Sequence, residues 1–129
     1  MTILGVTNSF TGPAEALEIV GNHAYAASGI VSDASSGSAA TTLLKFTSGN
    51  NYFVGWLNFT NNETATATIN LELSFNGTPV ISGVEGSSHF SYPQLYYILI
   101  PPYTEVELKW GSSGANTATA FLTGEIFRE

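Results

Sequence analysis

The most distinctive pattern in this chain is an uninterrupted apolar segment that leads into a strictly alternating one. Leu95 to Ile100 contains only apolar and aromatic residues, which predicts a short β-strand covered on both faces. Pro101 and Pro102 end that strand, because proline has no N–H to donate to a sheet. From Glu105 to Lys109 charged and apolar residues alternate, so this next strand has one solvated face. Two such strands joined by a rigid corner are typical of a β-sandwich.

Segments in which apolar and polar residues alternate recur along the chain, and turn residues separate one segment from the next. Strands are expected over residues 23–31, 41–47, 52–60, 66–75, 79–84, 95–100, 105–110 and 117–128. Asn76-Gly77 is a strong hairpin signal, because both residues tolerate a positive φ. No segment has a convincing helical period. We therefore predict an all-β antiparallel sandwich of about eight strands, with a jelly roll as the first choice and an immunoglobulin-like sandwich as the alternative.

The domain organisation follows from the length and from the N-terminal sequence. A chain of 129 residues is long enough for one domain with its own core. Residues 1–22 contain several glycines and no clear period, so we expect an N-terminal arm or edge segment there. Residues 23–129 are then expected to form a single β-sandwich domain.

Composition narrows the range of partners and of chemistry. Only 10% of the residues are charged, and the net charge is −7 with three basic residues, so neither nucleic acid nor an anionic membrane is an expected partner. The chain has no cysteine, which excludes disulfides, thiolate metal sites and cysteine nucleophiles. The N-terminus shows no basic region followed by an apolar run, so we expect synthesis in a cytoplasm without an export signal.

Three strands carry more apolar side chains than one core requires. Because monomers rarely expose large apolar patches, and aromatic residues are favoured in interface cores, the surplus predicts subunit contacts. The candidate residues for an oligomer or capsid interface are Tyr52, Val54, Trp56, Tyr96, Tyr97, Phe121 and Phe127. The alternative is that loops of the same chain cover these side chains.

Residues for catalysis or metal binding do not form a recognisable set. Glu85 and His89 have the spacing of a helical ligand pair, but the intervening glycine and serines disfavour a helix. Glu105 and Glu107 lie on one side of one strand, whereas glycosidase carboxylates usually face each other across a cleft. We expect no enzyme activity, no cofactor and no metal. Aromatic residues beside turns could instead stack on sugars, namely Tyr92, Tyr103 and Trp110.

Two segments carry a resemblance to a known class of protein. They are the strand–Pro-Pro–strand region from Ile100 to Val106 and the closing strand from Ala120 to Ile126. The region from about residue 41 to 128 resembles small β-sandwich structural proteins of tailed bacteriophages, of the capsid decoration or cement type. The resemblance implies a virion protein on the capsid exterior, often a homotrimer, that binds the major capsid protein and stabilises the shell.

Two other functions agree with the same sequence features. A carbohydrate-binding module would use the exposed aromatic residues, and a receptor-binding fibre or spike domain would share the sandwich and differ in its position on the particle. Both remain open alternatives to the virion decoration protein.

Overall fold

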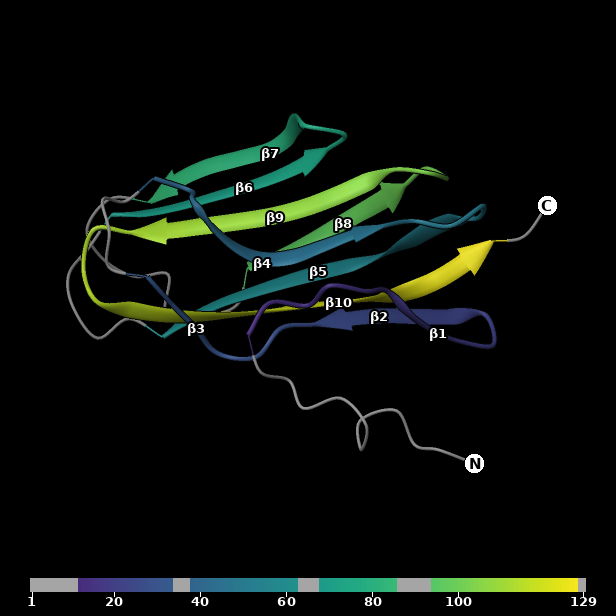
Figure 1. The fold of residues 1–129 in the computed structure, drawn as a ribbon, viewed down its shortest axis with the longest axis horizontal. Helices are drawn as coiled ribbons and strands as arrows, with labels where there is room; N and C mark the ends of the chain where they lie inside the picture. The colour runs from purple at the N-terminus through teal and green to yellow at the C-terminus, as the bar shows by residue number, and fades with distance from the viewer. Residues whose placement is uncertain (1–11, 34–37, 63–67, 86–93, 128–129) are drawn as a thin grey trace.

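The computed structural model describes residues 12–33, 38–62, 68–85 and 94–127, and these residues form ten β-strands and no helix. Figure 1 labels the strands, which are β1 (Glu18–Val20), β2 (His23–Ala27), β3 (Val31–Asp33), β4 (Thr41–Thr47), β5 (Tyr52–Asn62), β6 (Ile69–Phe75), β7 (Thr78–Glu85), β8 (Gln94–Ile100), β9 (Glu105–Ser112) and β10 (Asn116–Phe127). Within these ranges nothing qualifies as a membrane-spanning helix. The all-β prediction is confirmed, and the two additional strands, β1 and β3, have three residues each.

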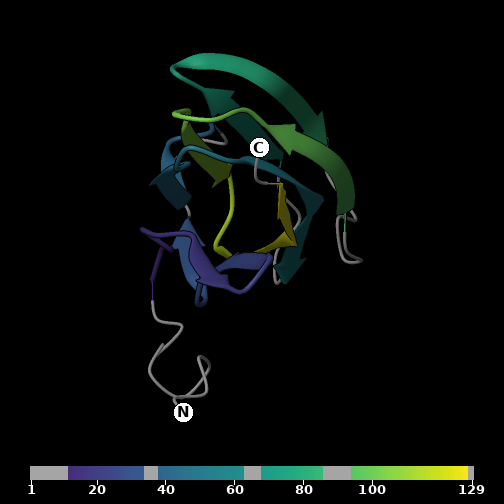
Figure 2. The same cartoon turned by 90° about the vertical axis from the view of Figure 1, so that its right-hand side faces the viewer.

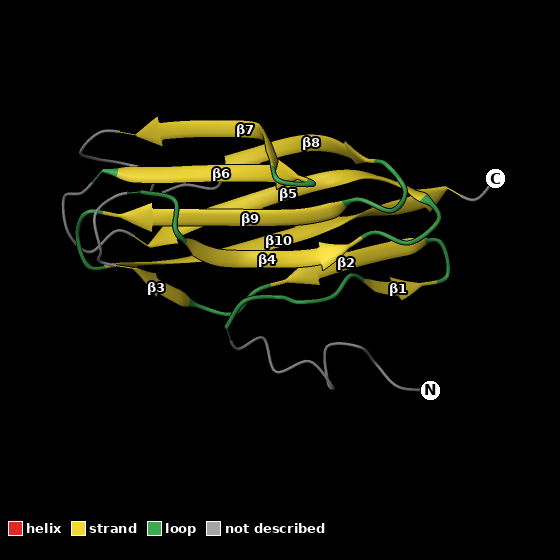
Figure 3. Ribbon diagram, turned by 45° about the horizontal axis from the view of Figure 1, so that its top comes forward, coloured by secondary structure: helices red, strands yellow, loops and turns green. Residues whose placement is uncertain are grey.

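The strands form two antiparallel sheets that pack face to face. The six-stranded sheet has the order β1-β2-β10-β5-β8, and β3 pairs with β10 beside this path. The four-stranded sheet has the order β4-β9-β6-β7. Figure 3 shows the four-stranded sheet as a layer in front of the other, and Figure 2 shows the two layers from the end of the strands.

The order of pairing identifies the sandwich as a jelly roll. β6 pairs with β7, β5 with β8, β4 with β9 and β2 with β10, so the pairs are nested like the two arms of one long hairpin. Additional pairing of β5 with β10 and of β6 with β9 rolls this hairpin into two sheets. This arrangement is the double Greek key of a jelly roll, which confirms the first choice over the immunoglobulin-like alternative.

The core lies between the sheets and is filled mainly by alternate residues of β2, β5, β6, β8, β9 and β10, together with residues of β4. Its largest fully buried side chains are Trp110, Phe53 and Phe59. The rings of Phe59 and Trp110, which come from opposite sheets, have centroids 6.2 Å apart. Burial of such rings on both inner faces supplies much of the hydrophobic stabilisation that holds the sheets together.

A pair of glycines allows one core ring to lie close to the backbone. Gly55 of β5 is directly opposite Gly124 of β10. A Cβ atom at Gly55 would come within 2.8 Å of Phe53 Cζ, and one at Gly124 within 2.9 Å of the same atom. The Phe53 ring therefore occupies the space that two side chains would otherwise take.

Two turns place the strands of the four-stranded sheet. At the hairpin between β6 and β7, Asn76 has a φ of 52° and Gly77 a φ of 82°, as the sequence predicted. At the corner between β8 and β9, Ser48 Oγ donates to Pro101 O at 2.7 Å and accepts from Thr104 N at 2.9 Å. The serine thus holds the corner against the end of β4.

The described part of the N-terminal segment contacts both sheets. Ala14 N donates to Leu43 O, and Ala14 O accepts from Lys45 N, each at 2.8 Å, so this residue lies along the edge of β4. β1 then pairs with β2 at an edge of the six-stranded sheet. The proposed division between an arm or edge segment at 1–22 and a domain at 23–129 stays a prediction.

Candidate functional site

The outer face of the six-stranded sheet is the main candidate for a functional surface. Because successive side chains of a strand point to opposite faces, the residues between the core positions of β5, β8 and β10 point away from the core. Eight of them are large and apolar, and we call this set the apolar face: Tyr52, Val54, Trp56, Leu95, Tyr97, Leu99, Phe121 and Phe127.

The register of the three strands gathers these side chains into one area. Trp56 is directly opposite Tyr97, and Val54 is opposite Leu99. Phe127 is opposite Tyr52 on the other side of β5. The rings of Trp56 and Tyr97 have centroids 4.9 Å apart and planes tilted by 60°, which is within the contact distance of interacting aromatic pairs.

Exposure of the apolar face is large for a single chain. Val54 is partly buried, and the exposed fractions of the other seven residues run from 41% at Tyr52 to 63% at Tyr97, with Trp56 at 48%. With about 150–250 Å² for each aromatic side chain, the eight residues together expose on the order of 700 Å². Isolated monomers rarely carry a contiguous apolar patch above about 300–600 Å², so this surface is suited to contact with another molecule.

The outer face of the four-stranded sheet has the opposite character. Lys45 is opposite Glu107, and Glu72 is opposite Lys109 across neighbouring strands. Lys109 Nζ lies 3.4 Å from a Glu72 carboxylate oxygen, and Thr42 Oγ1 donates to Glu107 Oε2 at 2.9 Å. The molecule therefore has one charged, solvated side and one apolar side.

Six of the seven predicted interface residues lie on the apolar face. The exception is Tyr96, whose side chain points to the opposite side of β8 and packs partly buried against the core, so its role as an interface residue stays a prediction. Leu95 and Leu99 share the parity of Tyr97 but are absent from the predicted interface set. Residues two apart in a strand point to the same face, so Leu95 and Leu99 can be placed beside Tyr97 once Tyr97 is known to point outward.

The expectation that residues 95–100 are covered on both faces is also wrong for the single chain. β8 is the last strand of its sheet, and Leu95, Tyr97 and Leu99 are 60%, 63% and 52% exposed. An entirely apolar strand can have its outer face covered by the same chain or by another molecule. The period of the sequence does not distinguish these two cases.

The predicted sugar-stacking residues do not form a common surface. Trp110 is fully buried in the core, so the prediction that it is exposed beside a turn is wrong. The cause is the parity of β9, in which Val106, Leu108 and Trp110 all point inward. Tyr103 is 71% exposed at the corner after β8, and Tyr92 lies outside the described residues.

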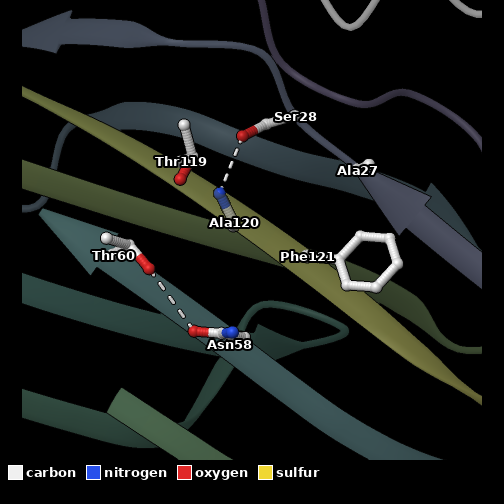
Figure 4. A pocket seen from close by; sticks show the side chains of 7 residues that line it. All are labelled: Ala27, Ser28, Asn58, Thr60, Thr119, Ala120 and Phe121. Atoms are coloured by element: carbon white, nitrogen blue, oxygen red, sulfur yellow. Dashed lines mark hydrogen bonds between the residues drawn. The ribbon is translucent and has the colours of Figure 1, made fainter. Parts of the chain in front are cut away.

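A hollow of about 290 Å³ lies at one edge of the apolar face. Figure 4 shows Asn58 and Thr60 on one side of it, Ser28 and Thr119 on the other, and the Phe121 ring at one end. Ser28 Oγ donates to Gly29 O and accepts from Ala120 N, so its hydroxyl is already satisfied. Hydroxyls and an amide beside a ring can bind a polar ligand, but the residues that line the hollow include no acid, base or activated nucleophile.

Candidate metal ligands are also separated in the described part of the chain. No group of three or more histidine, aspartate and glutamate side chains comes together there. His23 is exposed on β2 opposite Glu125, and His89 lies outside the described residues. The absence of a cofactor or metal stays a prediction.

Comparisons with known proteins give two distant likenesses. No protein-family model matches this chain, and no curated protein matches it. A chain in the structure of infectious bursal disease virus Gx strain is 15% identical with a TM-score of 0.44, and the match covers 74% of this chain and 30% of that one. The N-terminal cellulose-binding domain of Cellulomonas fimi β-1,4-glucanase C is 13% identical with a TM-score of 0.32, and the match covers 88% and 82%. At this level neither likeness indicates a function, so function is argued from the two faces of the sandwich.

Proposed function

We propose that this chain is a non-enzymatic structural protein of a virus particle, a decoration or cement protein on the outer surface of the capsid. In this proposal the apolar face lies on the major capsid protein, and the charged face of the four-stranded sheet points to solvent. Copies of the chain also associate with one another, so that many modest contacts act together over the shell.

The observation that carries the proposal is the difference between the two outer faces. Among the outward side chains of β5, β8 and β10 only Glu125, opposite Val54, is charged, whereas the other face contains two of the three basic residues and several carboxylates. A surface with so little charge costs little to desolvate when another protein covers it. The charged face is expensive to desolvate and is therefore expected to stay in water.

The size of the apolar face is adequate for a stable contact. Its exposed area of roughly 700 Å² is close to the ~800 Å² that each partner contributes to a standard protein–protein interface. On a symmetric shell the same contact repeats, and linked copies bind far more tightly than one copy does through their high effective concentration. Moderate affinity for each copy is then enough to hold the layer.

The direct test combines native mass with particle binding. Purified chain is measured by light scattering after size exclusion, and is then mixed with capsids of the encoding virus that lack it and sedimented. The proposal expects a species of more than one copy that sediments with the capsids. A monodisperse monomer at high concentration that stays in the supernatant would refute the proposal.

A second candidate function is carbohydrate binding, either as a module or as a receptor-binding fibre or spike domain. The observation that favours it is the hollow beside Phe121, where Asn58, Thr60 and Thr119 offer hydrogen-bonding groups next to an aromatic ring. A glycan array tests it. Binding that is lost with Phe121→Ala and kept with Tyr103→Ala would favour this candidate over capsid decoration.

A further inference from the structure

The edges of the two sheets differ in how they are protected against pairing with another chain. An exposed strand edge is a template for further pairing, and proteins block such edges with short strands, prolines, bulges or covering segments. β1 has only three residues. The edge of β4 is covered in part by Ala14, and β7 contains Pro79 at an irregularity in its register with β6.

The remaining edge strand, β8, carries none of these features within the described residues. It has seven residues from Gln94 to Ile100, without proline, glycine or charge, and its register with β5 is continuous. It is the last strand of its sheet in the described part of the chain. Its outward side chains, Leu95, Tyr97 and Leu99, are each more than half exposed. β8 is therefore the edge where pairing with another strand is least hindered.

We propose that β8 pairs antiparallel with β8 of a second copy of this chain, so that the six-stranded sheets of two copies join into one. The occupant is a second copy because β8 is complementary to itself: it brings no charge to the junction, and a chain with a net charge of −7 repels its copies least there. An antiparallel pair of identical strands closes about a twofold axis and leaves neither β8 edge open.

The geometry of such a pair agrees with the proposed function. This part of the inference rests on that function. The twofold axis of an antiparallel edge pair is perpendicular to the sheet, so the two apolar faces point the same way. Together they would present on the order of 1,400 Å² of apolar surface, at about 700 Å² for each copy. One side of the pair could then lie on the shell while both charged faces remain in water.

The register of the pair follows from the length of β8. Full overlap of Gln94–Ile100 with its copy places Tyr97, the central residue, on the twofold axis opposite itself. Leu95 of one copy is then opposite Leu99 of the other. Opposed residues in antiparallel strands have Cα atoms about 4.5–5.5 Å apart, which lies within the range of about 4.4–6.8 Å that a disulfide can bridge.

The absence of native cysteine makes this register directly testable. Three single variants, Leu95→Cys, Tyr97→Cys and Leu99→Cys, are oxidised with oxidised glutathione and run on non-reducing gels. Val80→Cys on β7 is the matched control, because Val80 is 49% exposed on another edge strand. Because each variant has one cysteine, a disulfide between two protein thiols always joins two chains, whereas the mixed disulfide with glutathione runs as a monomer on the gel. Circular dichroism checks that each variant is folded.

The expected result is specific to the antiparallel pair. Tyr97→Cys links to itself at least about tenfold faster than the control, because pairing raises the local thiol concentration toward the millimolar range. Leu95→Cys and Leu99→Cys link poorly alone and efficiently when the two are mixed. Because Tyr97→Cys also removes the contact with Trp56, the mixed pair provides an independent second measurement.

Three results would overturn the inference. They are no linkage above the control in either Tyr97→Cys or the mixed pair, equal linkage of all three single variants, and a native mass of three chains. The trimer implied by the sequence resemblance is thus a direct competitor. Linkage as expected in a protein that does not bind capsids would refute the decoration role and leave the β8 pair intact, so the two proposals fail separately.

Discussion

Replacement of Trp56 by serine measures how much the apolar face contributes to attachment. Trp56 is 48% exposed, which is roughly 120 Å² of a side chain of about 250 Å². If the capsid covers this area, its burial is worth about 3 kcal/mol at ~25 cal/mol per Å². The variant should therefore raise the Kd for empty capsids by about 100-fold, since 1.4 kcal/mol corresponds to a factor of ten.

The same substitution should leave the protein folded. The buried half of the ring contacts Tyr97, and aromatic pairs of this kind contribute about 0.5–1.5 kcal/mol beyond the area that they bury. The jelly-roll core between the sheets does not include Trp56. We therefore expect a modest fall in the free energy of unfolding, measured by urea denaturation, and an unchanged circular dichroism spectrum.

The assay is a capsid co-sedimentation titration with a matched control. Val80→Ser removes an apolar side chain of almost equal exposed fraction, 49%, from β7 of the other sheet, and should leave the Kd unchanged. A Kd for Trp56→Ser within about threefold of wild type, less than 1 kcal/mol, would refute the assignment of the apolar face to the capsid contact. An equal rise of the Kd in both variants would show that the capsid contact is not confined to the six-stranded sheet.

Three further predictions concern stability, each measured as the free energy of unfolding in urea. Gly124→Ala should lower it by about 1–3 kcal/mol, because the new Cβ meets the backbone of β5 and the Phe53 ring, and a neutral result would mean that β5 and β10 can move apart at this point. Asn61→Leu should raise it by about 1–3 kcal/mol, because the buried amide has no hydrogen-bond partner among the described residues; a loss would reveal a partner. Ser48→Ala should lower it by about 1–3 kcal/mol, because the N–H of Thr104 loses its acceptor at the corner; an unchanged value would mean that another group replaces the hydroxyl.

Several elements of this fold are already present in local sequence patterns. The alternation from Ile69 to Phe75 determines which side chains of β6 face the core, since a strand turns every second residue to the same side. The Asn76-Gly77 pair determines the hairpin that follows, because a turn of this type requires two positive φ angles. Parity within β5 likewise separates Phe53 and Leu57, which face the core, from Trp56 and its outward neighbours.

Two strands with equivalent sequence patterns, β5 and β8, occupy different positions in the sheet, and only the tertiary structure shows which of them is the edge strand. β5 and β8 both have apolar residues on both faces, yet β5 lies inside the six-stranded sheet and β8 at its end. Strand order depends on contacts between residues far apart in the chain, and no local period records it. Trp110 is a different case: its position near a turn predicted exposure, but the period of two in β9 turns it inward with Val106 and Leu108, and the facing sheet buries it.

Local sequence patterns therefore account for the strand content, the inward and outward parity of most strands, the low charge and the surplus of outward aromatic residues. The folded arrangement of the strands was needed to bring six of the seven predicted interface residues onto one face, to add Leu95 and Leu99 to them, and to leave β8 at the edge. The physical reason is that side-chain direction is set within a strand by its own period, whereas strand neighbours are set by pairing across the whole chain.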